Sequence, residues 1–155
     1  DHLAPLVLVA LNTGLRRGEL FGLTWQHVNL ATKVVTVTAG TAKSGRTRHV
    51  PLNAEALDVL TRWRTQGAGT GLVFANAEGK RFGNVQTSWE RLMVAAALPD
   101  FRFHDLRHSF ASKLVMRGVD LNTVRELLGH ADIKMTLRYA HLAPDKLADA
   151  VALLG

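Results

Sequence analysis

The sequence contains no cysteine among its 155 residues, which excludes disulfide bonds and metal sites built from thiolates. It also lacks a long apolar run, because the longest one, from Leu6 to Leu11, is far too short to span a lipid bilayer. No signal peptide is visible at the start of the chain. These absences predict a protein of a reducing compartment, the cytoplasm, without contact to a membrane.

Acidic side chains are the scarcer charged class: 13 Asp and Glu stand against 19 Lys and Arg, a formal net charge of +6. Such an excess favours a polyanionic partner but is weak evidence alone, since many basic domains bind nothing anionic. Aromatic residues make up only 6% of the chain, and Tyr139 is its single tyrosine. Any chemistry that needs a tyrosine hydroxyl therefore has only this residue to use.

The apolar content, by contrast, is sufficient for a core. Hydrophobic residues account for 47% of the chain, which predicts one globular domain. No internal repeat, low-complexity tract or domain boundary is visible. The chain begins with Asp1 instead of methionine and runs straight into a helical pattern, so we expect it to be part of something longer.

The densest group of reactive side chains lies between residues 101 and 142. One face of a predicted helix there is apolar at helical spacing: Phe103, Leu106, Phe110 and Leu114. His104 and His108 lie on the adjacent face, and Arg107 falls between the two faces. Because an unpaired charge at the edge of a core is costly, we expect an anion from the protein or a ligand to hold Arg107.

A second helix in this region is predicted by Leu121, Val124, Leu127 and Leu128. Gly129 stands where a left-handed residue would cap its C-terminus. His130 follows the cap, and Asp132 is placed to cap the helix that carries Tyr139.

Near the start of the chain, a helical pattern is broken at Thr13-Gly14 and resumes at Leu15. Arg16 is expected just inside the new helix, where free backbone N–H groups also favour an anion. The alternative is that Arg16 and Arg17 form a solvated face. Glu19 is expected to be a structural partner for a nearby cation.

A β-hairpin is predicted by alternation over residues 34–38 and 48–52 around a turn at 39–46. Pro51 indicates the edge of a sheet. Lys43 lies beside the bend, where a basic side chain is usually just solvated. The remaining expected elements are a short strand at 72–74 and helices at 54–64, 84–98 and 143–154.

Several of these segments carry a resemblance. HDLRH, LLGH, RYAHL, TGLRRGEL and KSGRTRHVPL resemble the motifs of the catalytic domain of tyrosine recombinases of the phage-integrase type, over nearly the whole chain. Gly18 departs from the pattern, since many members carry serine there. The resemblance implies a mostly helical α+β fold with a small antiparallel hairpin sheet at one edge. It also implies that residues 1–155 are a catalytic domain that lacks the family's N-terminal DNA-clamping domain.

The same resemblance implies a catalytic set: Arg16, Lys43, His104, Arg107, His130 and Tyr139. A tyrosine hydroxyl, with a pKa of about 10, is a poor nucleophile until its proton is removed and its target made electrophilic. Two arginines can hold a phosphodiester, a histidine can take the tyrosine proton, and a lysine can protonate the departing 5′ oxygen. The implied product is a 3′-phosphotyrosyl enzyme that needs no ATP, metal or other cofactor. The implied partners are double-stranded DNA and further copies of the protein, a tetramer on DNA.

Three alternative functions are compatible with parts of the sequence. A zinc hydrolase is suggested by His104 and His108 four residues apart, but Asp105 replaces the glutamate of HExxH and Arg107 would repel the metal. A type IB topoisomerase shares the cleavage chemistry, and a DNA-binding module without catalysis is the third. His108 remains open between helix packing and a supporting role at the site, and His141 is taken as structural.

Overall fold

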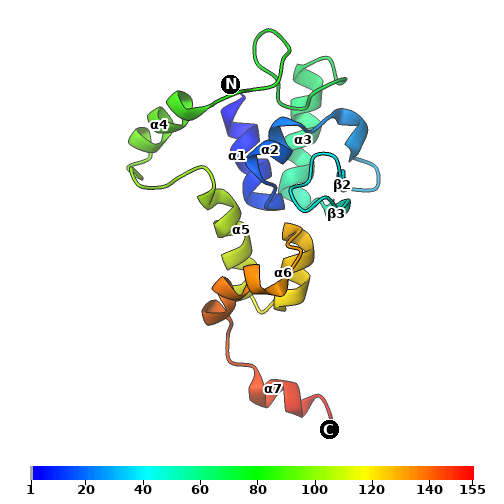
Figure 1. Cartoon of the computed structure of the whole chain (residues 1–155), viewed down its shortest axis with the longest axis vertical. Coiled ribbons are helices and arrows are strands. Elements are labelled where there is room, and N and C mark those ends of the chain that lie inside the picture. The colour runs from blue at the N-terminus through cyan, green and yellow to red at the C-terminus, as the bar shows by residue number, and fades with distance from the viewer. Residues whose placement is uncertain (1) are drawn as a thin grey trace.

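The computed structural model describes residues 2–155, so Asp1 lies outside the described part of the predicted domain. The chain is mostly helical (Figure 1). Its α-helices are α1 (Leu3–Thr13), α2 (Arg17–Phe21), α3 (Ala54–Gln66), α4 (Gln86–Ala95), α5 (Asp105–Met116), α6 (Leu121–Leu128) and α7 (Leu147–Ala152). Short 3-10 helices are η1 (Trp25–His27), η2 (Ile133–Met135) and η3 (Leu137–Leu142). With the small sheet described next, this confirms the α+β prediction.

The sheet has three antiparallel strands in the order β1 (Val28–Asn29), β2 (Val34–Val37) and β3 (Arg48–Pro51). The predicted hairpin is β2 and β3, and β1 adds a strand that was not foreseen. Buried Val35 and Val50 pair across the hairpin. The edge position of β3 agrees with Pro51, because a proline cannot donate a ladder hydrogen bond.

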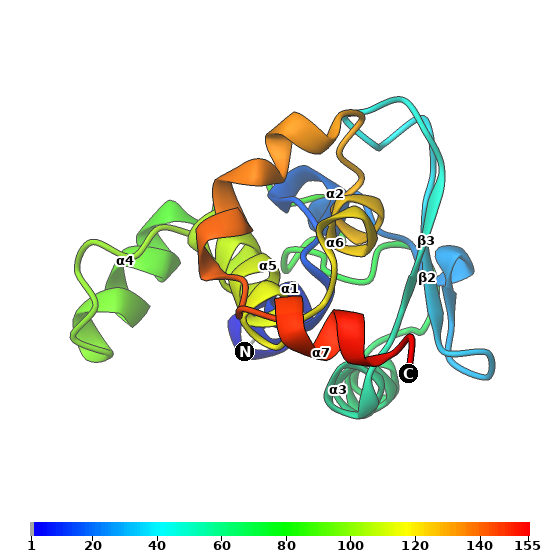
Figure 2. The same cartoon turned by 90° about the horizontal axis from the view of Figure 1, so that it is seen from below.

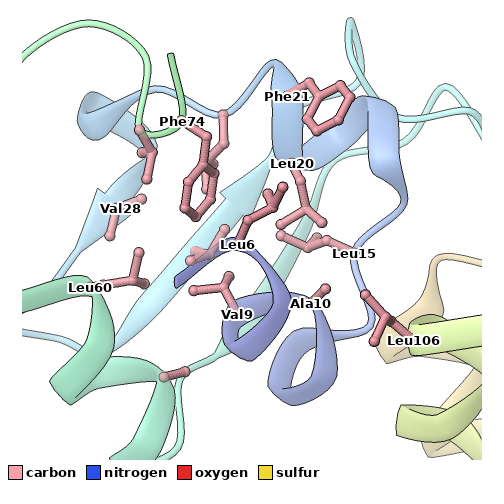
Figure 3. Close-up of a cluster of buried hydrophobic side chains, with 14 of the residues drawn as sticks. Leu6, Val9, Ala10, Leu15, Leu20, Phe21, Val28, Leu60, Phe74 and Leu106 are labelled. Carbon is pink, nitrogen blue, oxygen red and sulfur yellow. The ribbon is translucent and has the colours of Figure 1, made fainter. Parts of the chain in front are cut away.

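Helix α1 forms the centre of the larger core. Its side chains are apolar on nearly every side, which is typical of a helix enclosed by other elements. Leu6 and Val9 are 0% exposed and pack among side chains from α2, α3 and the region after α3, as Figure 3 shows around Leu20, Leu60 and Phe74. α1 contacts α3 on one side and α5 on another.

A smaller second cluster joins α5, α6 and η3. Its buried members are Ala111, Val115, Val124, Leu128 and Tyr139. Leu106, at the other end of α5, belongs to the larger core. Helix α5 therefore runs from one cluster to the other and fixes the C-terminal part of the chain against the N-terminal part (Figure 1).

Other boundaries differ from the sequence predictions. Residues 72–74 are not a strand, because only Leu72 forms a bridge, to Thr24. Helix α4 is shorter than expected and ends before Ala97, which has a positive φ of 57°.

The C-terminal helix begins at Leu147, later than expected, and does not fold back on its own domain. In Figure 1 it lies at the end of an extended stretch, apart from α5 and α6. Figure 2, the view from below, looks at the molecule from the side of this helix, which is therefore drawn over the elements behind it. Leu147, Val151 and Leu154 are 78%, 69% and 90% exposed. No helix within residues 2–155 is both long and apolar enough to cross a membrane.

Candidate active site

Arg107 is the most deeply buried arginine of the predicted set, at 4% exposure. Its Nη1 donates to the carbonyl oxygen of Gly14 at 2.6 Å, and its Nη2 to that of Leu128 at 2.7 Å. Both carbonyls lie at helix C-termini, where backbone oxygens lack intrahelical partners and carry partial negative charge. Backbone carbonyls at two helix ends, and not a carboxylate, are thus the hydrogen-bond partners of Arg107 among the described residues. The other possibility, that an anionic ligand holds this arginine, stays a prediction.

Burial, followed by the positive charge of Arg16, lowers the pKa of Arg107 to about 9. The guanidinium therefore stays cationic at neutral pH. Its position between α1 and α6 is fixed by two hydrogen bonds that leave its remaining N–H groups for other acceptors.

Glu19 and Arg48 form a buried ion pair beside this arginine. The Nη1 and Nη2 atoms of Arg48 donate to the two carboxylate oxygens of Glu19 at 2.7 and 2.8 Å. Burial acts to raise the pKa of Glu19, but the hydrogen bonds from Arg48 and from the backbone of Arg16 outweigh it and lower the pKa. Glu19 thus has the structural role expected, and Arg48 is its principal cation.

Arg48 also joins the hairpin to α6. Its Nε donates to the carbonyl oxygen of Leu127 at 3.0 Å, next to the Leu128 carbonyl that Arg107 occupies. Gly129 caps α6 with φ 74°, and a Cβ there would come within 2.7 Å of the Arg48 guanidinium. The left-handed cap predicted at Gly129 is confirmed, and the absence of a side chain makes room for Arg48.

Arg16 has a donor that the protein does not use. It is the N-cap residue of α2, one position before the first helical turn in which it was expected. Its Nη1 lies 3.7 Å from Oε2 of Glu19, is buried, and has no hydrogen-bond partner among the described residues. A buried N–H group without a partner is costly, so this donor is available to an acceptor from outside the chain.

His130 is 8% exposed, and its Nδ1 lies 2.7 Å from the hydroxyl of Thr136. Burial first, and then the charges of Arg107 and Arg16, lower the pKa of His130 to about 4. The ring is therefore neutral at physiological pH and can exchange hydrogen bonds without adding to the local positive charge. Asp132 caps η2, not the helix of Tyr139 as expected, because two short 3-10 helices replace one helix here.

Tyr139 lies on η3 and is 5% exposed. Its hydroxyl is 2.5 Å from Nδ1 of His108. Burial raises the pKa of Tyr139, while the charges of Arg138 and Arg107 act to lower it. The ring of His108 in turn contacts that of His104 edge to face, with centroids 4.7 Å apart.

A cavity of about 680 Å³ brings together three of the predicted residues. Arg16, Lys43 and His104 line it, together with Trp89 from α4 and Phe101 from the segment after α4. The lining of the cavity thus combines basic and aromatic side chains. Tyr139 does not line it but connects to it through His108 and His104.

A second cavity, of about 460 Å³, lies between the hairpin and α6. Arg46 and Arg48 from the hairpin and Arg125 from α6 line it, together with His130 from the segment after α6. Within residues 2–155, no three His, Asp or Glu side chains converge as a metal site would require. The zinc alternative therefore has no ligand set in the described part of the chain.

The structure thus collects the six predicted residues in one region of the molecule and adds three that the predictions did not include. Arg48, Thr136 and His108 hold Glu19, His130 and Tyr139, respectively. Two of them could be suspected from the sequence, because Arg48 lies in the hairpin motif and His108 in HDLRH. Nothing in the sequence distinguished Thr136.

Comparison with known proteins agrees with this architecture. A model of the phage integrase family matches residues 2–146. The integrase of Salmonella phage P22 is 35% identical over 96% of this chain and 41% of its own length. The tyrosine recombinase XerD of Pseudomonas aeruginosa is 37% identical over 88% of this chain and 48% of its own. The chain therefore spans less than half the length of these two relatives.

Solved structures show the same fold. The catalytic domain of bacteriophage HP1 integrase superposes with a TM-score of 0.71 at 31% identity, over 97% of this chain and 80% of that one. The XerH site-specific recombinase bound to its difH substrate gives a TM-score of 0.75 at 26% identity, over 97% of this chain and 46% of that one. The chain belongs to the phage integrase family, the tyrosine recombinases, and has the fold of their catalytic domain.

Proposed function

We propose that this chain catalyses site-specific DNA recombination by cutting and rejoining DNA strands through a covalent bond to Tyr139. The observation that carries the proposal is the unused buried donor of Arg16, set beside Arg107 and the neutral His130. Together these groups supply positive charge and N–H donors, and no carboxylate among the described residues accepts from all of these donors. A phosphodiester of DNA fits such a site in charge and in hydrogen-bonding chemistry.

The phosphate would be bound by Arg16 and Arg107, whose charges stabilise the negative charge that builds up on the non-bridging oxygens in the transition state. Arginines that act in this way in other phosphoryl transfers contribute roughly 10³ to 10⁵ in rate. Glu19 and Arg48 hold Arg16 and the end of α6 in place for this task. His130, fixed by Thr136, would donate or accept a hydrogen bond at the same phosphate.

Tyr139 would attack the phosphorus and form a 3′-phosphotyrosyl intermediate. Lys43 lines the cavity that contains Arg16 and His104, and it would protonate the departing 5′ oxygen. Such proton transfers typically contribute about 10² to 10⁴ in rate. The bond energy is conserved in the intermediate, so that rejoining requires no nucleotide, and the arginines supply the charge that a divalent ion would otherwise provide.

The partners would be double-stranded DNA and other copies of the protein, four on a recombining pair of sites. The exposed apolar residues of α7 support a contact with a second copy, since nothing in the chain's own described part covers them. We propose that this helix is exchanged between protomers.

The experiment is single-turnover cleavage of a nicked suicide substrate in the presence of EDTA, with the covalent complex separated by denaturing gel. Arg16→Ala should reduce adduct formation by roughly 10³ or more, by the arginine contribution given above. Arg62→Ala is the matched control, because Arg62 is an exposed arginine that lines neither cavity and should cleave at nearly the rate of the unmodified protein. Equal losses for both variants, or activity that EDTA removes and magnesium restores, would refute the proposal.

A further inference from the structure

Among residues 2–155, the group that hydrogen-bonds to the Tyr139 hydroxyl is His108, and neither of the two histidines of the predicted catalytic set does so. His130 uses Nδ1 on the hydroxyl of Thr136. His104 makes a ring contact with His108. The histidine in direct contact with the atom that attacks phosphorus is therefore the one whose role the sequence left open.

The packing of α5 against η3 explains why His108 reaches this hydroxyl. Ala111 and Val115 fix α5 in the smaller core, together with the ring of Tyr139, which belongs to the same cluster. His108 lies one turn before Ala111 and is half-buried, so its ring is directed along the side of the helix that faces η3. Both partners are thus held by packed elements and not by mobile loops.

We propose that His108 is the general base that takes the proton of Tyr139 during strand cleavage, a role that rests on the function proposed above. As the bond from Tyr139 Oη to phosphorus forms and the bond from phosphorus to the 5′ oxygen breaks, the proton moves from Oη to Nδ1 of His108. The 5′ oxygen takes a proton from Lys43. In rejoining, the 5′ hydroxyl attacks phosphorus and gives its proton back to Lys43, and His108 returns its proton to Tyr139 as the phosphotyrosyl bond breaks.

The electrostatic surroundings suit this exchange. The charged or titratable groups that act on His108 are Arg138 from η3 and His104, Asp105 and Arg107 from α5. Burial, and then the charge of Arg138, lower the pKa of His108, so the ring is neutral at pH 7 and Nδ1 can accept a proton when Nε2 carries the hydrogen.

Burial raises the pKa of Tyr139. Its hydroxyl therefore keeps its proton at neutral pH, and transfer to a weak base is unfavourable before DNA is bound. The proton leaves only as the oxygen–phosphorus bond forms, when the acidity of the hydroxyl rises. This is general-base catalysis, typically worth about 10² to 10⁴ in rate.

The test is the pH dependence of single-turnover cleavage at saturating DNA. With His108 intact, the rate should fall in acid as the ring becomes protonated, at a pH below the ordinary histidine value. His108→Asn keeps an acceptor near the position of Nδ1 but cannot take up a proton, so cleavage should slow by about 10² to 10⁴. The rate of this variant should also no longer fall in acid, so that the acid limb of its pH–rate profile is lost. His141→Asn, an exposed histidine on the same 3-10 helix, should leave both rate and profile unchanged.

Chemical rescue separates a base from a packing residue. His108→Ala should regain cleavage in proportion to the concentration of unprotonated imidazole in solution, with DNA affinity unchanged, and this measurement decides the matter if His108→Asn folds poorly. A His108→Asn rate within a few-fold of the unmodified protein with the same acid limb, or no rescue by imidazole, would overturn the assignment to His108. An adduct that still forms in Tyr139→Phe would instead overturn the proposed function itself.

Discussion

Replacing Arg48 by methionine tests the buried ion pair that holds the site together. The substitution keeps much of the side-chain stem but removes both hydrogen bonds to Glu19, at 2.7 and 2.8 Å, and the one to the Leu127 carbonyl at 3.0 Å. Glu19 would be left as a charge in a position only 4% exposed. Breaking one side of a buried pair typically costs about 3–5 kcal/mol in the free energy of unfolding, and we expect a loss in this range at pH 7.

The loss should depend on pH in a defined direction. Because the pKa of Glu19 is lowered in the folded protein, its stabilisation is present above the unfolded-state pKa, about 4.3, and disappears as pH falls through the folded-state value. Without Arg48, its hydrogen bonds and its charge no longer lower the pKa of Glu19 against the effect of burial, so that this pKa is higher in the variant than in the unmodified protein. Protonation of Glu19 therefore removes the buried charge from the variant as the pH falls. The difference in stability between the two proteins should therefore be largest near pH 7 and narrow toward pH 4.

Urea unfolding at several pH values measures this difference. Arg62→Met is the matched control, since Arg62 and Asp58 form an exposed pair, with side chains 76% and 59% exposed, and should cost no more than about 1 kcal/mol. Glu19→Gln added to Arg48→Met should recover part of the stability by removing the unpaired charge. A loss for Arg48→Met no larger than that of the control, or one independent of pH, would refute this account of the pair.

Further predictions concern the leaving group, DNA binding and the C-terminal helix. Lys43→Ala should cleave about 10² to 10⁴ slower, and a substrate with sulfur in place of the bridging 5′ oxygen should restore its rate, because a thiolate leaves with far less need for a proton. The same substrate should not restore the rates of Arg16→Ala and Arg107→Ala. If Lys43→Ala is equally slow on both substrates, Lys43 is not the acid. The DNA affinity of the chain should fall by roughly 10² between 50 and 200 mM salt if about four phosphates are contacted. Salt-insensitive binding in a filter or anisotropy assay would contradict a contribution of the chain's net charge of +6 to DNA binding. Deletion of residues 147–155 should leave the free energy of unfolding nearly unchanged but weaken the assembly of protomers on DNA, which sedimentation measures. Unaltered assembly would exclude exchange of this helix between protomers.

Local features of the fold were predictable from the sequence because they depend on neighbouring residues. The left-handed cap at Gly129 and the bend near Lys43 follow from backbone preferences within a few positions. The strand expected at 72–74 was wrong because β-structure needs a partner, and the sequence does not say that only Leu72 finds one.

Contacts between distant residues account for what could not be predicted in the site. Glu19 and Arg48 are 29 positions apart, and His108 and Tyr139 are 31 apart, so no periodicity within one element links them. For Arg107 the sequence indicated that the charge must be satisfied, but not by what. The ends of α1 and α6 supply backbone carbonyls there, and which helix ends meet is a property of the tertiary packing.

The most direct test of the central claim is to map the covalent adduct. The protein is trapped on a nicked suicide substrate, digested with trypsin and nuclease, and analysed by mass spectrometry. Cleavage after Arg138 and Lys146 releases residues 139–146, which contain the single tyrosine of the chain. The account predicts that the residual nucleotide is attached to this peptide at Tyr139 and that no adduct forms in Tyr139→Phe. A nucleotide on any other peptide of the chain, or an adduct that persists in Tyr139→Phe, would contradict it.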